Sequence, residues 1–434
     1  MEYIHKYHYQ PAELAARGEL PPLEESPIWL LGHRYDPEVG GLSSAGVCDE
    51  LRVGGRGRST THQHHHDSPL TTQASDQGEA QGQGDEEEGD CGPPTVFTML
   101  HGSERRWASF LTHFRSVVWC TYRAAFPRLG SDSYTSDMGW GCMLRTGQMV
   151  LAQTLTRHLL GTEWRRQSDR SSPLYAKMVQ WFADDPKQPF SLHRIAHAGL
   201  KYGKNVGEWF GPSTMAQVLE ELLKEFSPSG LRAYVCQDGC LYLDQLRRTA
   251  TAAHWPLDED DDEGQGKSWA PMLIMLPLRL GLDQLNEDYA PVLKETFRIP
   301  QSVGISGGKP RASLYFVGNQ DDYVFYLDPH TVQPAPRFPE VGDVPASEDV
   351  YDTFHCSAPL RLPIRDIDPS LCLAFYCRNR EDFDDFCARA IQLSEGPMPI
   401  FTVAERMPDY LVRPKPPKHS EKLFSDDEDD VVFI

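Results

Sequence analysis

The stretch Thr135-Ser-Asp-Met-Gly-Trp-Gly-Cys-Met-Leu-Arg-Thr-Gly-Gln148 places one cysteine, Cys142, directly after two glycines and a tryptophan. Apolar residues recur from Leu144 to Leu159, so the pattern predicts a helix that begins at Cys142. A helix N-terminus offers unpaired N–H groups and a positive dipole end, which favour thiolate over thiol and can bind an oxyanion. The glycines permit a tight turn and leave space beside the sulfur. The alternative is a buried core thiol, as free cysteines usually are.

The rest of the first half of the chain shows helical periodicity. Apolar residues at i, i+3, i+4 and i+7 predict an amphipathic helix from Trp107 that ends near Tyr122. Gly211-Pro-Ser213 supplies a start signal for another helix. Further helices are expected over Leu174–Phe182 and Leu192–Leu200.

The second half of the chain changes to short apolar, β-branched and aromatic runs bounded by turn residues, which are typical of strands. A short buried strand is also expected in Pro27-Ile-Trp-Leu-Leu-Gly32. Helix-rich sequence followed by strand-rich sequence indicates the α+β class. The expected strands of the second half are Tyr234–Cys236, Met272–Leu276, Leu314–Val317, Tyr323–Leu327 and Cys372–Tyr376.

A second motif, Tyr323-Val-Phe-Tyr-Leu-Asp-Pro-His-Thr331, carries a histidine beside a carboxylate at the end of a hydrophobic strand. Proline keeps the residue before it extended, and residues two apart in extended chain face the same side, so Asp328 and His330 can point toward one partner. A thiol protease needs an imidazole to accept the thiol proton and a polar group to hold its tautomer. The alternative is an Asp-Pro turn with an incidental histidine.

The chain contains 42 Lys and Arg against 63 Asp and Glu, a formal net charge of −21. Five, six and five of the acids fall in Asp85–Asp90, Asp258–Glu263 and Asp426–Asp430, and without these the net charge would be −5. The sequence has no basic stripe of the kind that displaces counterions from nucleic acid, so we expect no nucleic-acid partner. Residues 43–94, rich in Gly, Gln, Ser, Thr and acid, are expected to be disordered.

Compartment and membrane association follow from what the sequence lacks. It shows neither an apolar leader segment nor a run of about 18 apolar residues. The ten cysteines are few for 434 residues and do not have disulfide-framework spacing. We therefore expect a soluble, cytoplasmic protein with mostly reduced thiols.

Three groupings of potential metal ligands are weak. His62–His66 lies in the expected disordered segment, without second-shell support. Cys236 and Cys240 have no second pair at zinc spacing. His193 and His197 lie four residues apart, but no glutamate follows the first histidine as a zinc-protease motif requires. We expect neither a metal nor a cofactor.

The chain resembles the autophagins, the autophagy cysteine proteases, over residues 27–42 and 96–402. The resemblance implies a papain-like α+β fold with a small extra subdomain. It also implies cleavage of autophagy ubiquitin-like modifiers after a C-terminal glycine, both in the precursor and at the amide to phosphatidylethanolamine. The motifs that carry it are Trp119-Cys-Thr-Tyr-Arg123, Gly139-Trp-Gly-Cys-Met-Leu-Arg145, Trp209-Phe-Gly-Pro-Ser213, Gly307-Gly-Lys-Pro310 and Tyr326-Leu-Asp-Pro-His330.

Residue by residue, the resemblance implies four catalytic positions: Cys142 as nucleophile, His330 as base, Asp328 as its orienting carboxylate, and Tyr122 as an oxyanion donor beside the Cys142 backbone N–H. It further implies a substrate gate over the active-site groove. An indole and a Gly-Gly loop can form a slot that admits a residue without a side chain. The gate is expected to comprise Trp209 and the loop 306–311, with Gly307, Gly308 and Pro310.

Composition and the extent of the resemblance together give the expected domain organisation. Residues 1–26 form an N-terminal extension, 27–407 the catalytic domain with a disordered insertion at about 43–94 and an acidic loop at 258–266, and 408–434 a flexible acidic tail. The extension and the insertion match no segment of the family, and the C-terminus Val431-Val-Phe-Ile434 lacks the aromatic-x-x-aliphatic ending common in it. We expect a monomer that reaches membranes only through a lipidated substrate.

Two other functions remain open at the level of sequence. One is a catalytically weak adaptor that binds ubiquitin-like modifiers. The other is an acyltransferase or transglutaminase built on a similar Cys-His-Asp set.

Overall fold

The computed structural model describes residues 26–37, 102–130, 134–252, 269–309, 312–338 and 349–411. The three acidic runs, the predicted disordered segment 43–94, the cluster His62–His66 and Pro310 lie outside these ranges, as does the tail beyond Leu411.

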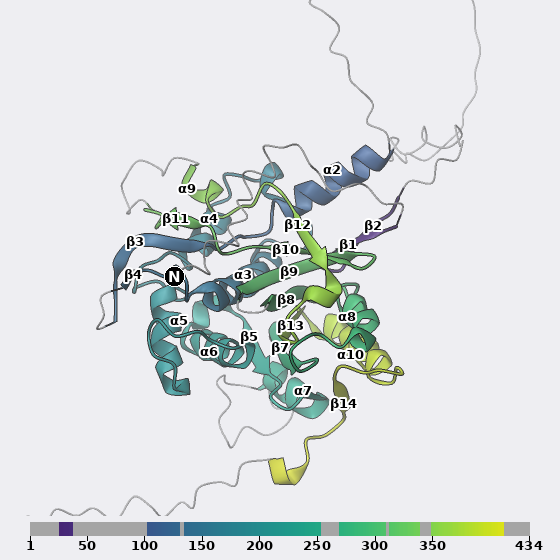
Figure 1. Ribbon diagram of the computed structural model, residues 1–434. Coiled ribbons are helices and arrows are strands. Elements are labelled where there is room, and N and C mark those ends of the chain that lie inside the picture. Colours follow the sequence, from purple (N-terminus) through teal and green to yellow (C-terminus); the bar gives the residue numbers. More distant parts are fainter. Residues whose placement is uncertain are drawn as a thin grey trace, which may run out of the picture.

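A nine-stranded, mostly antiparallel sheet forms the centre of the molecule (Figure 1). Its strand order is β12-β10-β9-β8-β13-β7-β5, with β1 pairing β9 and β2 pairing β1. Only β5 and β7 are parallel neighbours among the pairs of this sheet. The strands are β1 (Ile28–Leu30), β2 (His33–Tyr35), β5 (Arg232–Val235), β7 (Met272–Arg279), β8 (Ser302–Lys309), β9 (Ala312–Gln320), β10 (Tyr323–Leu327), β12 (Leu360–Pro363) and β13 (Ser370–Cys377).

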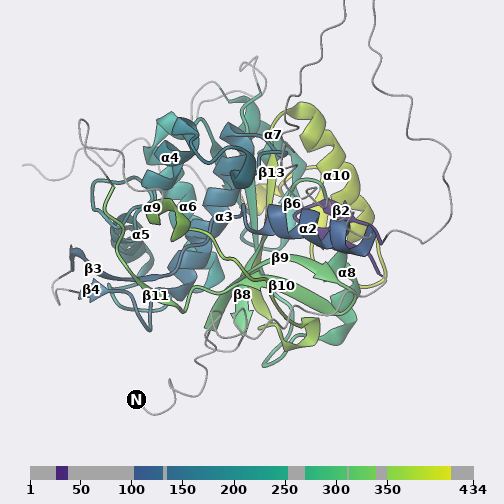
Figure 2. The same ribbon diagram turned by 90° about the horizontal axis from the view of Figure 1, so that it is seen from above.

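Helices cover both faces of this sheet (Figure 2). The α-helices are α2 (Gly102–Phe114), α3 (Cys142–Leu159), α4 (Pro173–Gln180), α5 (Leu192–Gly199), α6 (Pro212–Glu225), α7 (Leu243–Thr251), α8 (Ala290–Thr296), α9 (Asp349–Asp352) and α10 (Arg380–Ser394). The 3₁₀ helices are Arg166–Ser168, Leu200–Tyr202, Ser227–Ser229, Glu287–Tyr289, Ile364–Asp366 and Asp409–Leu411.

Alternation along the strands divides the core in two. Phe325 and Leu327 of β10 face α2, α3 and α6, whereas Val324 and Tyr326 face the side covered by α7, α8 and α10. The described residues therefore form an α+β fold, as the sequence predicts.

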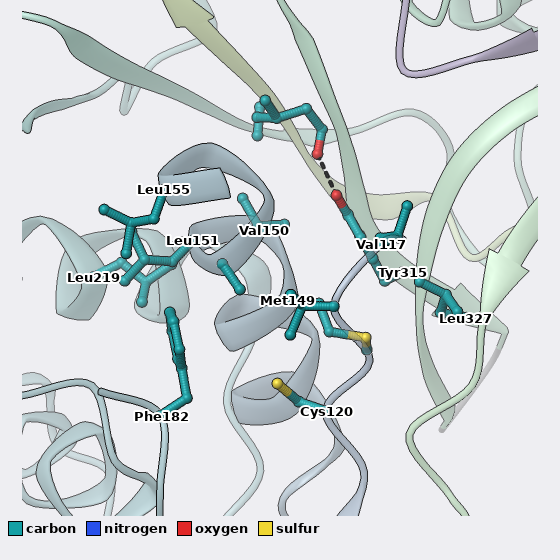
Figure 3. Packing of buried hydrophobic residues seen from close by; sticks show 14 of the residues in the cluster. Val117, Cys120, Met149, Val150, Leu151, Leu155, Phe182, Leu219, Tyr315 and Leu327 are labelled. Carbon is teal, nitrogen blue, oxygen red and sulfur yellow. Dashed lines mark hydrogen bonds between the residues drawn. The ribbon is translucent and has the colours of Figure 1, made fainter. Parts of the chain in front are cut away.

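Helix α3 is buried along nearly its whole length, so it is a core element and not a surface helix. Figure 3 shows it between Phe182 and Leu219 on one side and Tyr315 and Leu327 of the sheet on the other. The Tyr315 hydroxyl donates to the Val303 carbonyl at 2.6 Å, the dashed line in the figure. This packing fixes the position of the residue that begins the helix.

Two smaller sheets complete the fold. In one, the order is β11-β3-β4, with β11 (Val332–Pro334), β3 (Tyr122–Leu129) and β4 (Tyr134–Ser136). In the other, β14 (Thr402–Ala404) pairs in parallel with β6 (Cys240–Tyr242). In the first of these sheets Val332 pairs with Tyr122, which brings the segment after β10 next to the start of β3.

The predicted end of the helix from Trp107 is wrong. Helix α2 ends at Phe114, and Tyr122 begins a strand. Val118 forms a β-bridge with His355, and the Trp119 N–H donates to the Phe354 carbonyl at 2.7 Å, so long-range backbone pairing replaces the helix. The apolar periodicity continues because these extended residues are also buried.

The predicted gate loop 306–311 is also wrong in part, because residues 306–309 belong to β8. The other predicted elements are present. The strand at Pro27–Gly32, the helix at Cys142, the helices near 174 and 192, the helix after Gly211 and the five strands of the second half all form, with ends that shift by a few residues.

Candidate active site

Cys142 is the first residue of α3, and its side chain is nearly buried, with 8% of the residue exposed. Gly141 is the N-cap residue and has no side chain that could cap the first turn. The backbone N–H groups of the first turn of α3 are therefore available to an oxyanion near the Cys142 sulfur. Gly139 has φ +88°, a backbone conformation that residues with a side chain rarely adopt. The tight turn before the cysteine therefore depends on glycine.

Asp328 and His330 follow directly after β10 and face each other. His330 Nδ1 lies 2.5 Å from Asp328 Oδ1, and the same oxygen accepts the His330 backbone N–H at 2.9 Å. The Trp119 indole N–H donates to the Asp328 carbonyl at 2.8 Å. The two side chains lie together, but through a turn at residues 329–330 and not through the extended chain that the sequence analysis expects.

The small sheet brings this pair to Cys142. Val332 is in parallel register with Tyr122, and the Tyr122 N–H donates to the Pro329 carbonyl at 2.8 Å. The rings of Tyr122 and His330 meet edge to face at 5.3 Å. Strand β3 thus carries Tyr122 to the same place as His330, while the turn after β4 carries Cys142.

The electrostatics of the three groups are coupled. Burial acts to raise the pKa of Cys142, but hydrogen bonding and charge from His330, together with a backbone hydrogen bond to Ser313 and the Tyr122 hydroxyl, lower the pKa below its ordinary value. For His330, burial acts to lower the pKa, but Asp328 and Cys142 raise it to about 9. These opposite shifts favour a thiolate and imidazolium pair over the neutral thiol and imidazole.

The tyrosine stays protonated under the same conditions. Burial, followed by the charge of Cys142 and a hydrogen bond to it, raises the pKa of Tyr122 well above its usual range. A neutral hydroxyl beside the sulfur can donate a hydrogen bond, which is what an oxyanion site requires.

The predicted gate residues have different surroundings. Trp209 is 50% exposed, and its indole N–H donates to the Gly139 carbonyl at 2.7 Å, so the residue is not part of the core. A Cβ on Gly308 would lie 2.2 Å from the Ala312 carbonyl oxygen, and one on Gly307 would lie 3.1 Å from the Leu371 Cβ. Close strand pairing therefore explains Gly308 as well as a slot does.

Two contributors were missed from the sequence. The backbone of Ser313, at the start of β9, is a hydrogen-bond partner of the Cys142 sulfur. Arg145, three residues beyond Cys142, is buried and pairs with Asp137 and Asp184. Arg145 stands inside the quoted motif, but its burial depends on carboxylates that only the fold brings together.

The cluster His62–His66 lies outside the described residues, and the other two weak metal groupings do not converge. Within the described part of the chain, no group of three or more His, Cys, Asp or Glu side chains could hold a metal ion. His193 Nε2 donates to the Pro127 carbonyl at 2.7 Å, and His193 and His197 line a cavity of about 690 Å³ between β3, α5 and α6. Cys236 and Cys240 are free thiols, the first directly after β5 and the second at the start of β6, and these strands belong to different sheets.

Comparisons with known proteins match this chain to cysteine proteases. Residues 107–389, which include Cys142, Asp328 and His330, match the peptidase C54 catalytic domain. The cysteine protease ATG4B of Gallus gallus is 38% identical over 321 residues, or 69% of this chain and 80% of that protein. ATG4B of Xenopus laevis is 36% identical over 316 residues, with 70% and 81% covered. ATG4A of Oryza sativa subsp. indica is 39% identical over 347 residues, with 75% and 70% covered.

One further observation bears on membranes. Among the residues that the structure describes, no helix has the length and apolar character needed to span a bilayer.

Proposed function

The chain belongs to the peptidase C54 family and is an autophagy-related cysteine protease, and from this premise we propose that it cleaves ubiquitin-like autophagy modifiers after a C-terminal glycine. The substrates are the modifier precursor and the modifier linked to phosphatidylethanolamine. The observation that carries the proposal is the convergence of the Cys142 thiol, the His330 imidazole and the Asp328 carboxylate at the uncapped start of α3.

The bond-breaking steps follow from this arrangement. The Cys142 thiolate attacks the glycine carbonyl carbon, and the oxyanion that forms lies near the N-terminus of α3 and the Tyr122 hydroxyl. Asp328 occupies His330 Nδ1, so the Nε2 proton is the one given to the leaving amine as the carbon–nitrogen bond breaks. Water then attacks the acyl-enzyme, with His330 accepting its proton, and the glycine carboxylate and free thiol are released.

The same chemistry serves both substrates. A peptide bond after glycine and the amide between glycine and phosphatidylethanolamine present the same acyl group and differ only in the leaving amine. The two substrates differ only beyond the nitrogen of the leaving amine. One nucleophile, Cys142, and one acid, His330, can therefore cleave both.

Selection of glycine is assigned to the gate. The half-exposed Trp209, held by the Gly139 carbonyl just before the nucleophile, supports a wall beside the reacting carbonyl. Gly307, Gly308 and Pro310 are proposed as the opposite wall, although Pro310 lies outside the described residues. A side chain on the substrate residue would have to displace one of these walls.

The finer organisation remains a prediction of the resemblance. A buried helix that carries the nucleophile, packed against an antiparallel sheet from which the histidine segment emerges, supports a papain-like catalytic domain over 27–407 with a small extra subdomain. The N-terminal extension, the flexible tail, the monomeric state and the cytoplasmic location also stay predictions.

Cleavage assays on defined substrates test the proposal. Purified protein and its Cys142→Ala variant are incubated with a modifier precursor and with the lipid-linked modifier, and products are identified by mass spectrometry. We expect a free glycine carboxylate from both substrates with the wild type and none with the variant. A new amide product would indicate an acyltransferase. Tight binding of the modifier without turnover would indicate an adaptor.

A further inference from the structure

A buried ion network lies directly under the nucleophile. Arg145 Nε donates to Asp137 Oδ2 at 2.8 Å and Nη2 to Asp137 Oδ1 at 3.2 Å, while Nη1 donates to Asp184 Oδ1 at 2.9 Å. The same Nη1 donates to Gln148 Oε1 at 3.1 Å. The three charged side chains are at most 2% exposed.

Asp137 also holds the chain that precedes Cys142. Its side chain accepts the Arg123 backbone N–H at 2.7 Å, and its carbonyl accepts the N–H groups of Trp140 and Gly141 at 3.1 and 2.9 Å. A Cβ on Gly141 would lie 2.3 Å from Asp137 Oδ2, so the turn is packed tightly against the carboxylate. One aspartate thus joins strand β3, the turn and the first turn of α3.

Stability alone is a poor reason for such a network. Burying charges costs desolvation energy that their attraction often fails to recover, and apolar residues of similar volume are commonly as stabilising. What a guanidinium offers is direction, because its planar fork fixes the position of each carboxylate that it contacts. Here the fork fixes Asp137 from one side and is itself held by Asp184 from the other.

We propose that Arg145 is a positioning residue that, through Asp137 and Asp184, fixes the turn 137–141 so that Cys142 keeps its geometry toward His330 and Tyr122 during hydrolysis. This inference rests on the proposed function. The turn also presents the Gly139 carbonyl to Trp209, so the network positions the nucleophile and one wall of the gate together.

The expected consequence is a loss of turnover. If the sulfur shifts by about 1 Å from its attack position, the rate falls by roughly 100-fold, while binding of the modifier through its remaining surface is little affected. The thiol also moves relative to His330, so the pH dependence of its alkylation should shift toward that of an ordinary thiol.

Helix α3 provides a matched control. Arg157 lies twelve residues further along the same helix, is 3% exposed, and donates to the backbone carbonyls of Leu31 and Pro300. It is about 18 Å from Arg145 along the helix axis. Arg145→Lys and Arg157→Lys make the same chemical change at the same degree of burial, and both should lower the unfolding temperature.

The experiment compares kcat, KM, unfolding temperature and the pH profile of Cys142 alkylation by iodoacetamide for the two variants. We expect Arg145→Lys to lower kcat by roughly 100-fold with KM nearly unchanged and to shift the alkylation profile to higher pH. Arg157→Lys should leave kcat and the profile at wild-type values. Equal behaviour of the two variants would overturn the inference.

A second variant covers failure of Arg145→Lys to fold, as judged by circular dichroism. Asp184→Asn keeps the size of the side chain and an oxygen acceptor but removes the charge that holds Arg145. It should lower kcat and shift the alkylation profile in the same direction, by less, and wild-type values for both would overturn the inference. Cys142→Ala, assayed in parallel, separates the two ideas, because residual cleavage by that variant counts against the proposed function and not against Arg145.

Discussion

The thiol that begins α3 and the thiols in or directly next to the large sheet are all largely buried. Their pKa values are nevertheless shifted in opposite directions. Cys142 is 8% exposed, Cys236 1% and Cys377 0%. Burial raises the pKa of Cys236 to about 12 and that of Cys377 well above its usual range. The pKa of Cys142 is lowered, because interactions with His330, Ser313 and Tyr122 exceed the effect of burial. Cys236 also has hydrogen-bond partners, so the charge of His330, and neither exposure nor hydrogen bonding alone, sets Cys142 apart.

Secondary structure determines which partners are available. Cys377 lies at the end of β13 in register with Met272, within a backbone ladder. Cys142 precedes N–H groups of a helix that has no side-chain cap. The same residue type is therefore a packing group in a strand and a reactive group at a helix start.

Removal of the imidazole should have the largest effect and make Cys142 resemble the sheet thiols. His330→Ala deletes both the base and the charge that stabilises the thiolate, so kcat/KM should fall by roughly 10⁴-fold. Asp328→Ala should be nearly as damaging, and adding either change to Cys142→Ala should cost little more, because the three act as a unit. Steady-state kinetics on the precursor measure this. A deficit that is simply additive would show that the groups act independently.

The opposite pKa shifts of the pair predict a bell-shaped pH profile. Because the pKa of Cys142 is lowered and that of His330 is raised to about 9, kcat/KM should rise as the thiolate forms below the ordinary thiol range and fall as pH rises through about 9. Asp328→Asn removes a group that raises the His330 pKa, so its basic limb should move to lower pH.

The lowered pKa of Cys142 also predicts that iodoacetamide labels Cys142 faster than the other cysteines at neutral pH. Cys240 is more exposed than Cys142, so it is the matched control in mass-spectrometric mapping of iodoacetamide adducts. Faster labelling of Cys240 at pH 7 would show that exposure, and not ionisation, controls reactivity.

Much of this site could be predicted from local sequence. The helix start at Cys142 and the proximity of Asp328 and His330 both depend on neighbours within a few residues. The expected extended chain at 328–330 is wrong, because residues 329–330 form a turn in which the Asp328 carboxylate accepts the His330 backbone N–H. The strands of the second half could also be predicted, because short apolar runs bounded by turn residues are a local signal.

The remainder depends on contacts between distant segments. Tyr122 was placed at the end of a helix because its apolar spacing fits one, yet pairing with residues 329 and 332 makes it a strand. The family resemblance implies a loop at 306–311, whereas residues 306–309 belong to β8, where the close approach of Ala312 leaves no room for a side chain at Gly308. The burial of Arg145 likewise needs Asp184, 39 residues away. No local pattern encodes these partners.

Substitution of the gate should have a smaller effect than loss of the imidazole. A modifier with alanine at the cleavage point must push a methyl group into a wall, at a cost of about 1–3 kcal/mol. Trp209→Ala should weaken cleavage of the glycine substrate and narrow the difference between glycine and alanine substrates. Trp209→Phe keeps an apolar wall without the N–H to Gly139, so it separates the wall from the hydrogen bond. An unchanged glycine-to-alanine ratio of kcat/KM in Trp209→Ala would place glycine selection elsewhere.

The smallest effect on activity should come from a sheet thiol, and it completes the comparison. Cys377 packs in the cluster on the face of the sheet covered by α7, α8 and α10, away from the face that α3 covers. Cys377→Ala leaves a small cavity and should lower the free energy of unfolding by roughly 1 kcal/mol, with kcat/KM unchanged. Cys142→Ala should do the reverse, because the Cys142 sulfur lies at the edge of the core and the proposed acyl-enzyme cannot form without it. Urea unfolding and steady-state kinetics on both variants test this. Cys377→Ala should lose stability but keep kcat/KM, and Cys142→Ala should keep stability but lose kcat/KM. A loss of activity in Cys377→Ala, at full occupancy of the folded state, would mean that the far face of the sheet also positions the nucleophile.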